Sequence, residues 1–240
     1  MDIVAQLKST ELAGGVFTSM IVMLIMIILA IYIGIRAHFH DPLKKPKGML
    51  LIAEMGVTFF EDFAEGLLGR RFRIFGGYLM AIGVYLFLAF IFGLTGLPSP
   101  MTTLSVPLSL GLSTFVLIHA TAAKYNKIRY FKRYVEPLPF FLPVNLISMW
   151  APLLSLTLRL FGNALSGFVI MNIVYYALQN LSAMVFAAIE APLNEVFIAP
   201  FIAWILHLYF DLFSGFIQTT VFLSLTTIYV GQEAPEEYLD

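Results

Sequence analysis

The chain has 240 residues, of which 60% are hydrophobic and 12% charged, and its mean hydropathy is +0.88. Soluble domains carry about 25% charged residues, so this composition excludes a water-soluble globule, a disordered chain and a nucleic-acid-binding protein. The lack of cysteine excludes a disulfide framework, a thiolate metal site and a cysteine nucleophile, and the net charge of −1 indicates no partner. We therefore expect an all-α integral membrane protein.

Charged residues divide the chain into apolar segments. The uncharged run over residues 12–35 is too long for the apolar core of a signal peptide and predicts a first membrane helix. Residues 49–73 mix acidic and basic residues with large apolar ones, which predicts an amphipathic helix at the membrane surface. The next uncharged run, interrupted by Pro98 and Pro100, predicts a hairpin of two membrane helices over residues 76–122.

Two further apolar segments are unusually long. Residues 137–189 carry one charge, Arg159, and residues 196–232 carry one charge, Asp211. Helices over about 144–185 and 197–230 would be roughly 60 and 50 Å long, whereas the hydrocarbon layer is about 30 Å thick. Ordinary tilts, up to about 40°, do not accommodate that length. We predict a steeply tilted antiparallel hairpin over residues 144–230, as part of a single membrane domain over residues 1–240 with five spans and one surface helix.

Lysine and arginine are concentrated in two of the predicted loops. Residues 36–47 carry four and residues 124–133 carry five, whereas the linkers over residues 97–103 and 190–195 carry none. Loops rich in lysine and arginine face the cytoplasm. The distribution therefore predicts an outside N-terminus and a cytoplasmic C-terminus.

Arg159 lies in the middle of a predicted membrane helix. An arginine there costs about 2.5–3.5 kcal/mol on insertion scales, and the guanidinium does not lose its proton. The sequence offers no acidic residue within 22 positions on either side. Arg159 therefore either pairs with Asp211 across the hairpin or is a permanent cation that faces an external carboxylate or an ion path.

Polar residues follow helical spacing on both long segments, so each segment has one polar face. The two sets are Ser148, Ser155, Arg159, Asn163 and Ser166 on the first segment and His207, Asp211, Ser214 and Gln218 on the second. Hydrogen-bonded seams of this kind hold membrane helices together. A stripe with an uncompensated arginine favours an ion-translocating surface over a purely structural seam.

Two other groups are weaker candidates. His207 and Asp211 are spaced i, i+4, but two ligands are too few for a metal site, so we expect no metal and no cofactor. Glu190 and Glu195 flank the outer linker, where they are either solvated loop charges or the lining of an ion entrance.

The polar stripe also contains a specific motif. Residues 155–167, Ser-Leu-Thr-Leu-Arg-Leu-Phe-Gly-Asn-Ala-Leu-Ser-Gly, resemble the signature of subunit a of the F-type ATP synthase membrane sector. Residues 99–103, 143–147, 216–222 and 225–229 resemble other segments of the same family. The resemblance covers roughly residues 45–232.

The resemblance implies a stator subunit that is not an enzyme by itself. It implies a bacterial plasma membrane location and a complex with the c-subunit ring, the peripheral-stalk b subunits and the F1 head, in contact with membrane lipid. In this family the arginine, here Arg159, faces the carboxylates of the ring between two offset aqueous half-channels. Asn163 matches the family's asparagine four residues after the arginine, and Gln218 matches the glutamine that faces the arginine region from the last helix.

Three positions depart from the family's pattern. Phe168 stands where many relatives carry glutamate, Asp211 where many carry histidine, and Ser148 and Met149 where another glutamate is common. We therefore expect Asp211 to be the protonatable group of the outer half-channel, with Glu190 and Glu195 at its mouth. The coupling ion is expected to be the proton, although the ring's own binding site sets that choice.

Two other classes of function fit parts of the pattern. A secondary transporter would use Arg159 to bind an anionic substrate, but the sequence shows no inverted repeat. An intramembrane enzyme would use His207 and Asp211, but a third catalytic group is missing from the motif.

Overall fold

The computed structural model describes residues 10–41, 44–127, 130, 138–186 and 198–234, and in these ranges it contains no strand. The α-helices are α2 (Thr10–His38), α3 (Met49–Leu68), α4 (Gly76–Ile91), α5 (Ser105–Asn126), α7 (Leu142–Val185), α9 (Ala199–His207) and α10 (Ser214–Gln232). Short 3₁₀ segments cover Arg70–Phe75, Phe92–Thr95, Pro100–Thr102 and Pro139–Phe141, and a π-helical segment, Leu208–Phe213, joins α9 to α10.

Five helical stretches of the described chain are long and apolar enough to cross a membrane. They are Gly14–His38, Arg70–Thr95, Ser105–Asn126, Leu142–Val185 and Ala199–Gln232. The prediction of an all-α, multi-pass membrane protein is confirmed. The surface position of α3 and the orientation of the termini stay predictions.

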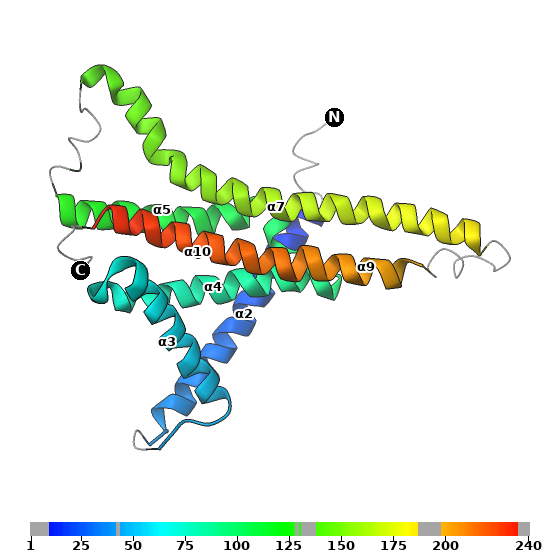
Figure 1. Ribbon diagram of the computed structural model, residues 1–240, viewed down its shortest axis with the longest axis horizontal. Helices are drawn as coiled ribbons and strands as arrows, with labels where there is room; N and C mark the ends of the chain where they lie inside the picture. The colour runs from blue at the N-terminus through cyan, green and yellow to red at the C-terminus, as the bar shows by residue number, and fades with distance from the viewer. Residues whose placement is uncertain (1–9, 42–43, 128–129, 131–137, 187–197, 235–240) are drawn as a thin grey trace.

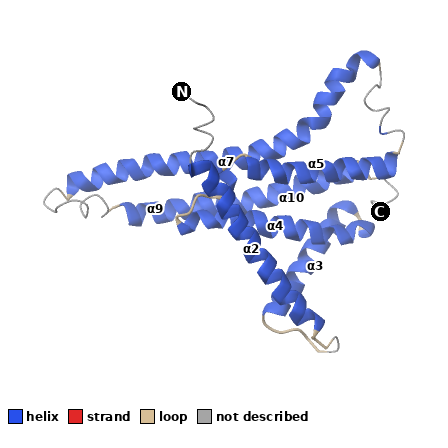
Figure 2. Ribbon diagram, turned by 180° about the vertical axis from the view of Figure 1, so that it is seen from behind, coloured by secondary structure: helices blue, strands red, loops and turns tan. Residues whose placement is uncertain are grey.

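The helices form two groups in space. Figures 1 and 2 show α4, α5, α7 and α10 running roughly alongside one another, with α2 and α3 inclined to them. The largest buried cluster lies where these groups meet and includes Leu79 and Leu86 of α4, Leu156 and Leu160 of α7 and Phe222 of α10. Lipid is as apolar as these side chains, so van der Waals packing rather than the hydrophobic effect holds the cluster together in a membrane.

The amphipathic helix ends five residues earlier than its predicted end at residue 73. Gly69 has a φ of 83°, a left-handed conformation that ends α3 at Leu68, and its N–H donates to the carbonyl of Glu65 at 2.9 Å. The chain then turns back, so that Arg73 Nε donates to Glu61 Oε2 at 2.9 Å. The predicted basic end of the helix is therefore a separate 3₁₀ segment that is paired with α3.

Gly76 permits a backbone-to-backbone contact between α3 and α4. A Cβ atom at Gly76 would lie 2.6 Å from the Cα atom of Glu61 and 2.7 Å from its backbone nitrogen, whereas a Cβ atom at Gly77 would have no neighbour within 4 Å. The atoms that would clash are backbone atoms of α3, which cannot move aside as the end of a flexible side chain could. We expect Gly76→Ala to lower the free energy of unfolding by about 1–3 kcal/mol.

The neighbouring substitution is the control for this prediction. We expect Gly77→Ala to be neutral or slightly stabilising, because alanine has the higher helix propensity. The midpoints of thermal unfolding of the two variants in detergent measure the difference. Equal midpoints would contradict the close packing of α3 on α4.

The two long segments run antiparallel to each other. Helix α7 has 44 residues, roughly 65 Å at 1.5 Å per residue, and α9, the π segment and α10 extend back along it (Figure 1). Pro152 lies inside α7, where it removes one backbone hydrogen bond and favours a bend. Figure 1 shows the first part of α7 turned away from α5. The inclination of this pair in a membrane stays a prediction.

Candidate functional site

Arg159 lies midway along α7 on an apolar, exposed face. Its neighbours Leu154 and Leu158 are each more than half exposed. Arg159 is itself exposed, and its Nη2 donates to Ser155 Oγ at a long 3.4 Å. No carboxylate of the described residues forms an ion pair with Arg159. The pairing of Arg159 with Asp211, one of the two alternatives, is therefore absent from the structure.

Asn163 is the residue that joins α7 to α10. Its Nδ2 donates to Ser214 Oγ at 2.9 Å and is 3.5 Å from Gln218 Oε1. Gln218 is 6% exposed, and its Nε2 is buried without a hydrogen-bond partner. Gln218 thus contacts Asn163, which lies one helical turn after Arg159.

A chain of three protonatable side chains connects α7 to α9. Tyr175 Oη is 2.8 Å from His207 Nε2, and His207 Nδ1 is 2.6 Å from Asp211 Oδ2. A carboxylate only accepts, so Nδ1 carries a proton and Nε2 of a neutral ring accepts from the tyrosine hydroxyl. Asp211 lies in the π-helical segment, a local widening that is frequent at functional sites.

This chain of residues opens onto a cavity of about 400 Å³. The linker between α4 and α5 closes one side, and Gly93 makes room for the carboxylate, because a Cβ atom there would lie 3.1 Å from Asp211 Oδ1. We call this space the linker cavity. Its polar and aromatic lining includes Asn163, Phe168, Asn172, Tyr175, His207 and Asp211.

A second cavity, of about 490 Å³, lies toward the opposite end of α10. It occupies the space between α5, the end of α10 and the part of α7 that Pro152 turns away. We call it the terminal cavity. Its polar lining includes His119, Tyr130, Asn145, Ser148, Ser155, Gln232 and Glu233.

The two cavities lie on either side of Arg159. Ser155 lines the terminal cavity and Asn163 lines the linker cavity. Each is four residues from Arg159, which is about 6 Å along the helix axis. The single cation of the long helix therefore separates two polar spaces.

The structure brings together most of the predicted site residues, but not all. Ser166 Oγ donates to the backbone carbonyl of Asn163 at 3.0 Å and does not join the network between the helices. Glu190 and Glu195 lie outside the described residues. Within the described ranges, no group of three or more His, Cys, Asp or Glu side chains could hold a metal ion.

Tyr175 is the residue that the sequence did not indicate. It follows Ser166 by nine residues, or two and a half turns, so an ideal helix would present it on the face opposite the polar stripe. Its contact with His207 depends on how α9 packs against α7.

Comparison with known families identifies the family of this chain. The family model described as ATP synthase A chain matches residues 16–231. The chain belongs to the ATP synthase A chain family.

Individual relatives support this membership. The ATP synthase subunit a of Mycoplasma genitalium is 31% identical over 235 residues, covering 92% of this chain and 78% of its own, and that of Mycoplasma pneumoniae is 30% identical, covering 96% and 83%. The protein of Propionigenium modestum named ATP synthase subunit a, sodium ion specific, is 35% identical over 146 residues, covering 60% of this chain and 44% of its own.

Membership in the ATP synthase A chain family confirms the resemblance seen in the signature around Arg159. It confirms the prediction of a non-catalytic, multi-pass membrane subunit that takes part in ion transport and ATP synthesis. It is incompatible with the secondary transporter and the intramembrane enzyme that the polar pattern left open.

Proposed function

We propose that this chain is the stator subunit of a rotary F-type ATP synthase and couples proton flow to rotation of a c-subunit ring. The observation that carries the proposal is Arg159, an exposed cation on an apolar face that has no carboxylate partner among the described residues. Leaving such a side chain against lipid costs about 2.5–3.5 kcal/mol. A carboxylate on a neighbouring membrane protein would remove that cost.

The two cavities supply the half-channels of this mechanism. The linker cavity would connect one side of the membrane to the level of Asn163, and the terminal cavity would connect the other side to Ser155. Both end one helical turn from Arg159. An ion that enters through one cavity would have to travel on the ring to reach the other, because the fixed positive charge lies between them.

The guanidinium makes transfer by way of the ring obligatory. It keeps a passing ring carboxylate ionised, and an ionised carboxylate does not enter lipid cheaply. Each ring carboxylate therefore has to load a proton from one cavity before it turns into the lipid and release it into the other cavity. Moving one charge through the membrane potential supplies about 2.3 kcal/mol per 100 mV.

The hydrogen-bonded chain in the linker cavity favours the proton as the coupling ion. Tyr175, His207 and Asp211 all exchange protons and are joined by bonds of 2.8 and 2.6 Å. Asp211 would take the role of the common glutamate, which is replaced by Phe168. The sodium ion specificity in the name of the Propionigenium modestum protein is a property of that protein.

The proposal includes the partners and the orientation. The chain would sit in a bacterial plasma membrane with its N-terminus outside and its C-terminus in the cytoplasm, against the c-ring, the b subunits and the F1 head. The linker cavity would then lie on the outer side of the membrane, because the linker between α4 and α5 that lines it has no lysine or arginine. The terminal cavity would face the cytoplasm.

Single cysteines test the half-channels, since the natural chain has none. In the whole complex, we expect Asn172→Cys to react with a membrane-impermeant thiol reagent added outside, and Ser148→Cys to react from the cytoplasmic side. The control is Ile173→Cys, whose apolar position is 62% exposed on α7 and should face lipid or the ring. Labelling is measured by mass of the modified chain.

The three positions together decide the outcome. Equal labelling of Asn172→Cys and Ile173→Cys would contradict a water-filled outer cavity. Labelling of Asn172→Cys and Ser148→Cys from the same side would contradict the arrangement of two half-channels on opposite sides.

A further inference from the structure

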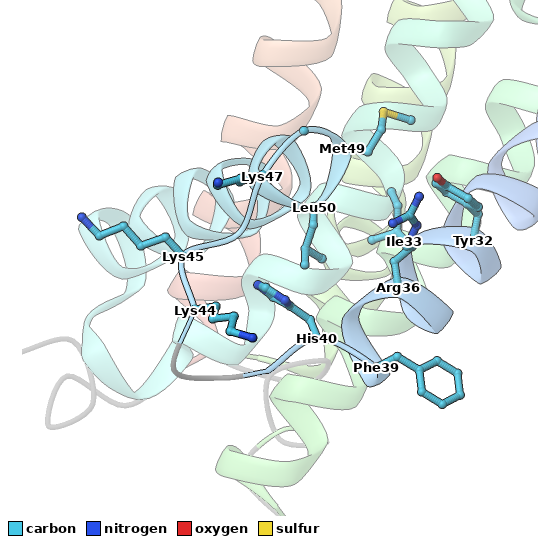
Figure 3. A pocket seen from close by; sticks show the side chains of 11 residues that line it. Tyr32, Ile33, Arg36, Phe39, His40, Lys44, Lys45, Lys47, Met49 and Leu50 are labelled. Atoms are coloured by element: carbon cyan, nitrogen blue, oxygen red, sulfur yellow. The ribbon is translucent and has the colours of Figure 1, made fainter.

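A third cavity, of about 760 Å³, lies between the end of α2 and the start of α3 and shares no lining residue with the linker cavity or the terminal cavity. Figure 3 shows cationic side chains around it together with apolar ones from both helices. We call it the basic pocket. Its lining includes the cationic Arg36, Lys44, Lys45 and Lys47, the polar His40 and Tyr32, and the apolar Ile33, Phe39, Met49 and Leu50.

Most of the positive charge in the basic pocket is uncompensated. Lys44 Nζ lies 3.7 Å from Asp41 Oδ2, in an exposed and therefore weak pair. The guanidinium of Arg36 lies over the ring of Tyr32, with 5.6 Å from its central carbon to the ring centroid. Within the described ranges, Lys45 and Lys47 form no ion pair.

Two further donors are available to an anion. His40 Nε2 is buried and has no hydrogen-bond partner in the described structure. The first turn of α3 contributes Met49 and Leu50 to the lining, and no side chain caps that end of the helix. The N–H groups and the positive end of a helix favour an anion.

We propose that the basic pocket binds the phosphate headgroup of an anionic phospholipid. Clustered lysine and arginine side chains are common phosphate binders. The pocket lies at the end of α2, which is long and apolar enough to cross a membrane, so it would lie near the headgroups. Ile28, Ile31 and Ile35 of α2 are each more than half exposed. They offer an apolar surface for the acyl chain beside the charged pocket.

This arrangement goes beyond what membrane orientation requires. Lysine and arginine that only hold a loop in the cytoplasm can extend into open water. Here exposed lysines line the rim of a half-open pocket that also has an apolar wall and a buried, unpartnered ring nitrogen. An amphiphile with a phosphate fits that combination, whereas an acidic peptide would leave the apolar wall and the adjacent face of α2 uncovered.

The test compares lipid selectivity in charge variants of the full chain. The chain is placed in bilayers of phosphatidylcholine with an equal amount of phosphatidylglycerol, and a spin-labelled phosphatidylglycerol reports the immobilised lipid. We expect Lys45→Gln with Lys47→Gln to weaken phosphatidylglycerol binding by about 25-fold, since each lost hydrogen bond to the bound phosphate costs about fivefold. Lys45→Arg with Lys47→Arg should retain the binding.

The matched control removes the same charge elsewhere. Lys124→Gln with Lys127→Gln, in the other basic region, should leave phosphatidylglycerol binding unchanged. An equal loss in that control would show general attraction to the surface and would overturn the proposal. Retained binding in the Lys45 and Lys47 glutamine variant would overturn it as well.

Two further measurements distinguish the lipid from the other possible occupants of the basic pocket. Displacement of the labelled lipid by inorganic phosphate at equal concentration would show that the pocket takes the free ion, and the lipid assignment would be wrong. Loss of another subunit from the purified complex, with phosphatidylglycerol selectivity intact, would show that the pocket is a protein contact. Unaltered subunit content with lost selectivity supports the lipid.

Discussion

Vesicles that contain the Arg159→Ala variant should show no ATP-driven acidification, although the complex should assemble at normal yield. Within the described chain Arg159 makes one long hydrogen bond, to Ser155 at 3.4 Å, so its removal costs the fold little. The ring carboxylates, in contrast, would lose the charge that keeps them ionised between the two cavities. Loss of stabilisation worth about 2.5–3.5 kcal/mol corresponds to a loss of flux of about 100-fold or more.

Arg159→Lys is expected to fail almost as completely. A lysine ammonium is a compact point charge that loses its proton when it is desolvated, and it lacks the planar fork that binds a carboxylate through two parallel bonds. Quenching of a pH-sensitive fluorescent dye in sodium-free buffer measures the acidification of the vesicles. ATP formation under an imposed pH gradient measures the reverse reaction.

Lys124→Ala is the matched control, because it removes a cation at the end of α5. That variant should acidify vesicles normally. Normal acidification by Arg159→Ala would refute the role of Arg159. A wild-type complex that pumps only when sodium is present would refute the proton as the coupling ion.

The membrane helices could be predicted because charge is expensive in lipid and therefore rare there. The uncharged runs and the two basic loops place the five membrane-crossing segments with errors of a few residues. The predicted end of α3 was less accurate, because Arg70 and Arg73 continue the amphipathic pattern of the sequence beyond the end of the helix. The left-handed turn at Gly69 ends the helix, and this conformation is not encoded in hydrophobic spacing.

The polar seam could also be predicted in large part. Steps of three and four residues placed Asn163, Ser214 and Gln218 on facing stripes, and hydrogen bonds join them in the structure. His207 and Asp211, four residues apart, are bonded to each other. Local spacing carries this information, because residues three or four apart share a helix face.

The cavities and Tyr175 could not be predicted from spacing. The terminal cavity depends on the direction in which α7 bends at Pro152, and the linker cavity depends on how the residues between α4 and α5 fold over α7. Both are tertiary features. The signature indicated where Arg159 acts, but only the packing shows which polar spaces flank it.

Asp211→Asn should lower proton flux per complex severalfold or more while leaving the yield of complex unchanged. Asp211 lines the linker cavity, its side chain is 22% exposed, and it is bonded to His207 at 2.6 Å. Asparagine keeps the size of the side chain and an oxygen that accepts the same bond, but it does not titrate. Flux is measured as the initial rate of acidification divided by the amount of intact complex.

The rival explanation makes Asp211 a structural partner. In the structure that partner is His207 rather than Arg159, so the rival view is an ion pair within the segment that joins α9 to α10. Breaking a partly buried charged pair is destabilising, and this view predicts a reduced yield of complex with normal flux in what remains. Ser224→Ala is the control, because its hydroxyl bonds to the carbonyl of Thr220 in the same helix and does not contact the cavity.

A double-mutant cycle with Tyr175→Phe separates relay from packing. If protons pass along Tyr175, His207 and Asp211, removing either end interrupts the same path, and the combined variant should lose little more flux than Asp211→Asn alone. If the two side chains act independently, their losses multiply. Unchanged yield and unchanged flux in Asp211→Asn would defeat both the relay and the ion pair, and the outer path would then have to run through water and the two glutamates of the next linker, Glu190 and Glu195.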